Sequence, residues 1–141
     1  MRNSKPILLV EDDRVDAMTV ERALKDLKVT NQLIHKRNGE EALQYLQDAN
    51  NKKPCVILLD LNMPKMNGIE FLKATKADEN LRKIPVVALT TSTEEQDIMD
   101  TFKLNIAGYM VKPVDYKRFI ETIRTIEMYW TLSELPYEEE E

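Results

Sequence analysis

The chain has little cysteine, little glycine and no long apolar run, and each shortage excludes a class of protein. Cys55 is the single cysteine among 141 residues, so an internal disulfide is excluded and a reducing, cytoplasmic location is expected. The three glycines lie far apart, which argues against the glycine-rich loop of a nucleotide-binding enzyme. The longest apolar runs are far shorter than the roughly 20 residues that cross a bilayer, so we expect no membrane-spanning segment.

The length and the net charge of the chain exclude further classes of protein. A chain of 141 residues suits one domain with one core, which we place at residues 1–133, and leaves no room for a separate output domain. Residues 134–141 end in four glutamates and are expected to form an acidic, disordered tail. A net charge of −5 argues against direct binding of nucleic acid. The first residues lead straight into an apolar strand, so no signal peptide is expected.

Four short apolar segments are predicted to be buried strands, and a polar group follows each of them. These segments are residues 7–10, 55–59, 86–89 and 107–111, followed in turn by Glu11-Asp12-Asp13, Asp60, Thr90 and Lys112. A weaker strand at 33–34 is expected at an edge, with His35 exposed beside it. Helical patterns separate the strands. Repeated strand–helix units with uniformly apolar strands are typical of an α/β doubly wound fold, a parallel sheet with helices on both faces.

The fourth helix and the last helix carry specific expectations. Thr91 or Ser92, with Glu94 or Glu95, is expected to form a capping box before the fourth helix, and Phe102 is expected to face the core. The last helix is expected to run from about Asp115 to Leu132. Its predicted apolar stripe contains Phe119, Ile123, Ile126 and Trp130.

The polar groups at the strand ends point to phosphoryl transfer. The carboxyl ends of parallel strands form the edge of the sheet where open α/β folds bind ligands. Glu11, Asp12 and Asp60 brought together there would repel one another unless a cation lay among them, and oxygen ligands of this kind suit Mg²⁺. Lys112 adds a fixed positive charge. In this setting Asp60 is the candidate nucleophile, and Thr90 can donate its hydroxyl to a phosphoryl oxygen.

Each of these features also has a plain structural explanation. Residues 11–13 could merely be acidic residues that favour a helix N-terminus, with Asp13 as the N-cap. Asp60 could be a turn residue, and Lys112-Pro113 could be only a strand stop. Four such coincidences at four strand ends are improbable, so a functional site is the preferred interpretation.

Taken together, these motifs resemble the response-regulator receiver domain of two-component signalling. The resemblance covers residues from about Lys5 to Leu132 and rests on the motifs at 10–13, 59–64, 66–68, 85–90 and 108–113. Each motif alone is moderately specific, whereas the set in this order is highly specific. The resemblance implies a CheY-like (flavodoxin-like) five-stranded parallel sheet of order 2-1-3-4-5, with the site where strands 1 and 3 meet.

The resemblance also implies a role for each acidic residue of the site. Asp60 would accept a phosphoryl group from the phosphohistidine of a sensor histidine kinase or of a phosphotransfer protein. Asp12 would bind Mg²⁺ directly and Glu11 would bind it through water. Asp60 and the backbone carbonyl of Asn62 would complete the protein ligands.

Further residues acquire roles from the same resemblance. Thr90 and Lys112 would hold the phosphoryl oxygens, and Tyr109 would be the aromatic switch that carries the signal to the fourth helix, the strand at 107–111 and the last helix. Thr91 is bulkier than the residue often found at its position, so slower entry of small phosphodonors is expected. Such a protein is not an enzyme in the usual sense, because it catalyses only its own phosphorylation and dephosphorylation.

A narrower similarity concerns the partners. The stretch 84–115 and the extended last helix are similar to the stand-alone receivers of phytochromes, which makes a phytochrome the candidate kinase. Met128, Tyr129, Trp130 and Leu132 crowd the end of that helix. The helix end either folds back on its own domain or forms a symmetric homodimer, and we favour the dimer because these receivers associate.

Three rival classes are compatible with parts of the pattern. A flavodoxin-like electron carrier would bind its flavin phosphate in the loop after the first strand, where residues 11–13 would repel it. A phosphatase with an aspartate nucleophile needs a second acid two residues on, where Asn62 stands. A pseudo-receiver that binds partners without phosphorylation is the strongest rival, although it would usually lack Asp60, Thr90 or Lys112.

Overall fold

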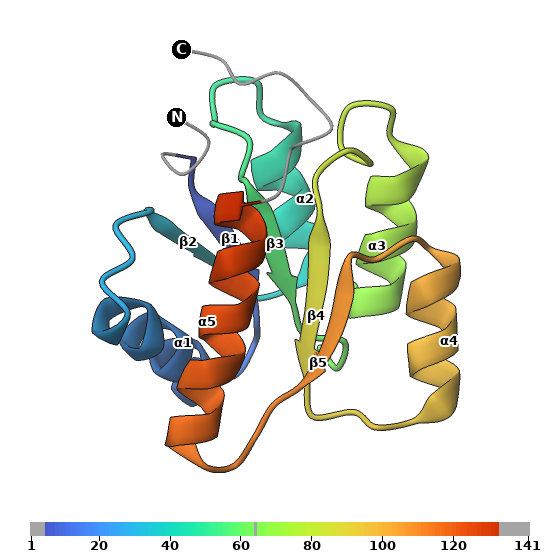
Figure 1. Ribbon diagram of the computed structural model, residues 1–141. Helices are drawn as coiled ribbons and strands as arrows, with labels where there is room; N and C mark the ends of the chain where they lie inside the picture. Colours follow the sequence, from blue (N-terminus) through green and yellow to red (C-terminus); the bar gives the residue numbers. More distant parts are fainter. Residues whose placement is uncertain (1–4, 64, 133–141) are drawn as a thin grey trace.

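Five strands alternate with five helices in the computed structural model, which describes residues 5–63 and 65–132 (Figure 1). The elements in chain order are β1 (Ile7–Val10), α1 (Arg14–Asp26), β2 (Leu33–Lys36), α2 (Gly39–Gln47), β3 (Val56–Leu59), α3 (Gly68–Ala77), β4 (Val86–Thr90), α4 (Glu95–Lys103), β5 (Gly108–Val111) and α5 (Tyr116–Leu132). The predicted tail at 134–141 lies outside the described residues. Among the helices of the described ranges, none combines the length and the apolar character that a bilayer crossing requires.

The strands form one parallel sheet in the order β2-β1-β3-β4-β5, which confirms the predicted topology. Val10 at the end of β1 pairs with Leu59 at the end of β3, so the residues that follow these strands are neighbours. Thr90 at the end of β4 pairs with Val111 at the end of β5. Since all strands run in one direction, the polar residues after β1, β3 and β5 meet at one edge of the sheet.

Alternate residues of the central strands fill two separate cores. Ile7 and Leu9 of β1 pack in the core that α1 and α5 cover, whereas Leu8 and Val10 pack in the core that α2 and α3 cover. Figure 1 shows the same division, with α1 and α5 on one face of the sheet and α2, α3 and α4 on the other. Burial of both faces explains why these strands are continuously apolar.

The last helix buries its predicted stripe, which includes one residue of the predicted dimer patch. Phe119, Ile123, Ile126 and Trp130 are all buried against the core beneath α1 and α5. Trp130 is only 1% exposed, so its place in the predicted dimer patch is wrong: the indole folds back on its own domain. Met128 and Tyr129 remain exposed.

Helix α4 differs from the prediction in two respects. Phe102 is 51% exposed, and Thr101 takes the inward position because its hydroxyl donates to the carbonyl of Ile98 at 2.8 Å, which offsets the cost of burying it. The predicted capping box does not form. Glu94 is the N-cap without a side-chain hydrogen bond, and the Ser92 hydroxyl instead accepts from the Glu94 amide at 3.3 Å.

Candidate functional site

Three carboxylates meet where β1 and β3 end. Glu11, Asp12 and Asp60 each place one oxygen so that all three atoms lie within 4.8 Å of one another. The pairing of the strands explains this convergence, because the Asp60 amide donates to the carbonyl of Val10 at 3.0 Å. Glu11 and Asp60 are buried, whereas Asp12 is exposed. The structure thus brings together the three acidic side chains that the sequence singled out.

One carboxylate oxygen of Asp60 is buried without a partner among the described residues. Asp60 Oδ1 is buried and makes no hydrogen bond within the described part of the chain. A buried carboxylate oxygen without a partner is unfavourable, so the site calls for a group that the protein does not supply. With Glu11 and Asp12 beside it, the donor set consists of oxygen atoms alone, which suits a hard divalent cation. The residues present therefore fit a divalent metal ion.

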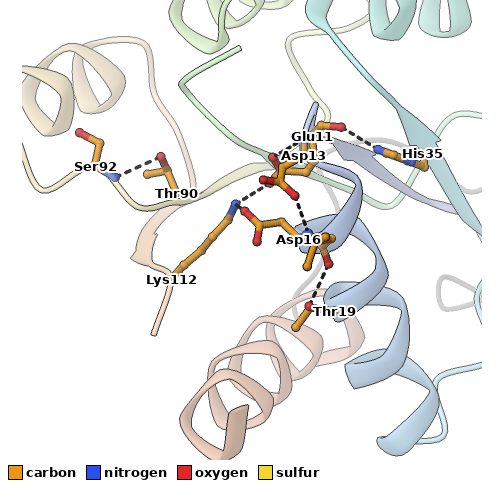
Figure 2. Close-up of polar contacts among 9 residues, drawn as sticks. Glu11, Asp13, Asp16, Thr19, His35, Thr90, Ser92 and Lys112 are labelled. Atoms are coloured by element: carbon orange, nitrogen blue, oxygen red, sulfur yellow. Dashed lines mark hydrogen bonds and ion pairs between the residues drawn. The ribbon is translucent and has the colours of Figure 1, made fainter. Parts of the chain in front are cut away.

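Lys112 reaches the acidic cluster from the end of β5 (Figure 2). Its Nζ donates to Glu11 Oε1 at 2.5 Å and to Asp16 Oδ2 at 2.9 Å. The lysine amide also donates to the carbonyl of Thr90 at 2.8 Å, which fixes the start of the loop after β5. A buried positive charge consequently lies between β1 and α1.

The protonation of this pair is set by burial and by the partners. Burial raises the pKa of the Glu11 carboxyl from 4.5 to about 7; the hydrogen bond from Lys112 opposes this shift and the charge of Asp60 adds to it. For Lys112, burial acts to lower the pKa, but the hydrogen bonds to Glu11 and Asp16 outweigh it, so the pKa is raised. Lys112 therefore keeps its positive charge at neutral pH.

A polar cavity of about 520 Å³ opens at this cluster. It is lined by Glu11, Asp12, Asp13, Arg14, Val15, Asp16, Asp60, Asn62, Thr91 and Lys112. Thr90 and Tyr109 are not among these described lining residues. Thr91 does line the cavity, and its expected effect on the entry of small phosphodonors stays a prediction.

The two predicted switch residues meet at Ser92 instead. The Thr90 side chain is buried, and its Oγ1 accepts from the Ser92 amide at 3.3 Å, as Figure 2 shows. The Tyr109 hydroxyl donates to the carbonyl of Ser92 at 2.9 Å. The Ser92 hydroxyl in turn donates to Asp97 of α4 at 2.7 Å. Ser92 therefore connects the end of β4, the aromatic ring on β5 and helix α4.

The loop after β3 returns very close to Asp60. The Gly68 amide donates to the carbonyl of Leu61 at 3.0 Å. A Cβ atom on Gly68 would lie 2.6 Å from Leu61 Cα and 2.7 Å from the carbonyl oxygen of Asp60. Asn67 and Glu70 complete a capping box at the start of α3. The motif at 66–68 thus holds the beginning of α3 against the backbone of the site.

Two residues contact the site although the sequence assigned neither of them to it, Asp16 and His35. Asp13 caps α1 as predicted by accepting from the Asp16 amide at 3.0 Å, and the Asp16 side chain accepts from Lys112 Nζ at 2.9 Å. The signal was an acidic residue in the first helical turn after the cap. His35 is exposed as predicted, yet its Nε2 lies 2.7 Å from the carbonyl oxygen of Glu11 (Figure 2). No pattern in the sequence predicts that contact.

The sheet order and the carboxylate–lysine cluster at its carboxyl edge define the class, a CheY-like signalling domain. Residues 7–124 match the response regulator receiver domain. The chain belongs to this family of two-component signalling proteins, as the sequence motifs predicted.

Relatives match over most of their length. The response regulator Rcp1 of Synechocystis is 38% identical over 130 residues, which cover 89% of this chain and 88% of Rcp1. The probable methanogenesis regulatory protein FilR2 of Methanothrix harundinacea is 39% identical over 127 residues, 88% of this chain and 82% of FilR2.

Solved structures agree with both the fold and the family. The phosphorylated cyanobacterial phytochrome response regulator RcpA superimposes with a TM-score of 0.87 at 37% identity, covering 94% of this chain and 99% of RcpA. The Mn²⁺-bound form of Rcp1 gives a TM-score of 0.85 at 38% identity over the same shares of the two chains.

Proposed function

We propose that this protein accepts a phosphoryl group on Asp60 from the phosphohistidine of a sensor histidine kinase or a phosphotransfer protein. The observation that carries the proposal is the buried Oδ1 of Asp60, which has no partner among the described residues. The ion pair of Glu11 and Lys112 lies beside it. An Asp60 oxygen attacks phosphorus, the P–N bond breaks, and its electron pair returns to the imidazole ring, which leaves as neutral histidine when its other nitrogen is protonated. The protein acts on itself alone and is not an enzyme in the usual sense.

We assign the metal to Mg²⁺. Asp12 and Asp60 would bind it directly with the backbone carbonyl of Asn62, and Glu11 would bind it through water. The all-oxygen cluster and the Mn²⁺-bound form of the relative Rcp1 support this assignment. When bound, the ion neutralises charge on the phosphoryl oxygens.

Lys112 and Thr90 hold the phosphoryl oxygens in the phosphorylated state. To do so, the Thr90 hydroxyl leaves the Ser92 amide that it accepts from in this structure. Since Tyr109 contacts the carbonyl of the same Ser92, movement of Thr90 changes the surroundings of the ring. Phosphorylation then shifts the population between two arrangements of this loop.

The signal leaves through the surface of α4, β5 and α5. Met99 and Phe102 on α4 and Val111 on β5 are exposed apolar residues, which supports an interaction surface there. A homodimer would use the exposed Met128 and Tyr129 at the end of α5. Sedimentation velocity should show a dimer whose fraction changes with beryllofluoride and falls when Met128 and Tyr129 are both replaced by glutamate. A monomer at high concentration in both states would contradict the dimer.

The partner proposals follow from the relatives. RcpA is a cyanobacterial phytochrome response regulator, and its similarity to this chain supports a phytochrome as the kinase. The receiver domain comprises residues 1–133 and the remaining eight residues, 134–141, form the acidic tail. The protein acts in the cytoplasm and binds no nucleic acid directly, in keeping with its net charge of −5.

Intact-mass spectrometry after incubation with acetyl phosphate and Mg²⁺ tests the central step. The wild-type protein should gain one base-labile phosphoryl group, and Asp60→Asn should gain none. Asp13→Asn is the matched control, because asparagine caps a helix as well as aspartate and removes one charge from the same cavity. Undiminished labelling of Asp60→Asn would overturn the proposal.

A further inference from the structure

Lys112 is shared between two carboxylates that differ in their surroundings. Its ammonium group donates to Glu11 Oε1 and to Asp16 Oδ2 (Figure 2). The Glu11 side chain is deeply buried and belongs to the acidic cluster, whereas the Asp16 side chain is 40% exposed and lies outside that cluster. Asp16 can therefore be neutralised without removing a carboxylate of the cluster.

The position of Asp16 gives it influence over the cavity. Asp16, Thr91 and Lys112 line both the cavity at Asp60 and a second cavity of about 460 Å³ between α1 and the loop after β5. The Asp16–Lys112 ion pair consequently forms part of the wall between the two spaces. This pair holds the ammonium group of Lys112 toward α1. The Asp16 carboxylate also offsets the positive charge of Lys112, which would otherwise attract an anion at Asp60.

We propose that Asp16 is a positioning residue that restrains Lys112 and so limits the affinity of the site for a phosphoryl group. The inference rests on the proposed function, since it assumes that the anion binds at Asp60 with help from Lys112. An incoming phosphoryl oxygen must compete with the Asp16 carboxylate for the same ammonium group. Neutralising Asp16 removes the competitor and strengthens anion binding.

A purely structural role for Asp16 predicts the opposite sign. Asp16 is the acidic residue in the first turn of α1, where a negative charge stabilises the helix. If that were its whole contribution, neutralisation would loosen the start of α1 and weaken binding at the neighbouring cluster. A gain in affinity therefore separates the two roles.

Binding of beryllofluoride, a phosphoryl analogue, to the full chain in the presence of Mg²⁺ tests the inference. Isothermal titration calorimetry should give a dissociation constant about two- to five-fold lower for Asp16→Asn than for the wild type, as expected for loss of a partly exposed ion pair. Asp13→Asn removes one charge from the same cavity without touching Lys112. Its affinity should rise less than about two-fold, because salt screens a charge that acts only through space.

Two further measurements complete the design. Asp16→Glu retains the charge and should return the affinity toward the wild-type value. If Asp16→Asn folds poorly, Asp16→Ser takes its place and should show the same gain in affinity. Mg²⁺ affinity without beryllofluoride should change no more in Asp16→Asn than in Asp13→Asn. Equal beryllofluoride affinities for Asp16→Asn and Asp13→Asn, with binding by the wild type intact, would overturn the inference alone. A wild-type protein that binds no beryllofluoride and takes no phosphate would overturn the proposed function as well.

Discussion

Replacement of Gly68 by alanine should destabilise the protein, because the new methyl group has no space. Its Cβ would lie 2.6 Å from Leu61 Cα and 2.7 Å from the carbonyl oxygen of Asp60, whereas Cβ contacts under 3.0 Å essentially never occur. Both obstacles are backbone atoms, so no side-chain rotation relieves the clash. Overpacking of a core costs about 1–3 kcal/mol, and a backbone obstacle places the expected loss near the upper end, about 2–3 kcal/mol of unfolding free energy.

Gly108→Ala provides the matched control. A Cβ atom there would meet only Val87 Cγ1, at 3.8 Å, which is ordinary van der Waals contact. Because glycine weakens a strand, this variant should be neutral or more stable by up to about 1 kcal/mol. Urea unfolding followed by circular dichroism measures both variants. Phosphorylation by acetyl phosphate should also slow in Gly68→Ala, since the displaced backbone carries Asp60. Equal stability of the two alanine variants would refute this reasoning.

Three further predictions concern the site. The raised pKa of Glu11 means that the folded state holds the proton more tightly than the unfolded state. The resulting contribution to stability, up to about 3 kcal/mol, is complete below pH 4.5 and is lost as the pH rises to about 7. In EDTA, urea unfolding of Glu11→Gln should show a shallower decline of stability over that range, and an identical decline would contradict the assignment. Mg²⁺ should raise the melting temperature of the wild type but not of Asp12→Ala, as calorimetry can establish, and a wild-type response in that variant would place the metal elsewhere. Thr90→Ala should still accept phosphate on Asp60, yet the amide NMR signals of α4 should no longer shift on phosphorylation; a wild-type shift would exclude Thr90 from the coupling.

The acidic cluster could be predicted because it follows from topology. Buried parallel strands place the residues after them at one edge, so Glu11 and Asp60 had to become neighbours once β1 and β3 were adjacent. The apolar stripe of α5 follows from helical periodicity in the same way. These features depend on the backbone path and on the burial of apolar side chains, and both leave a clear pattern in the sequence.

Other features depend on side-chain geometry that leaves no such pattern. The contact of Asp16 with Lys112 requires a particular orientation of α1 relative to β5. Phe102 is exposed because the hydroxyl of Thr101 is satisfied within its own helix, which allowed the smaller residue to take the inward place. The apolar neighbours Met128 and Tyr129 favour a surface patch that includes Trp130, whereas helical spacing places Trp130 on the buried stripe, where the structure has it.

The most direct test of the account is the position of the phosphoryl group itself. Borohydride reduces an aspartyl phosphate to homoserine, and mass spectrometry of the resulting peptides locates that residue in the chain. After incubation of the wild-type protein with acetyl phosphate and Mg²⁺, homoserine should be found in place of Asp60 and nowhere else, and it should be absent when the phosphodonor is left out. Homoserine in place of Asp12 or Asp13, or none in a sample that has gained a phosphoryl group, would contradict the account.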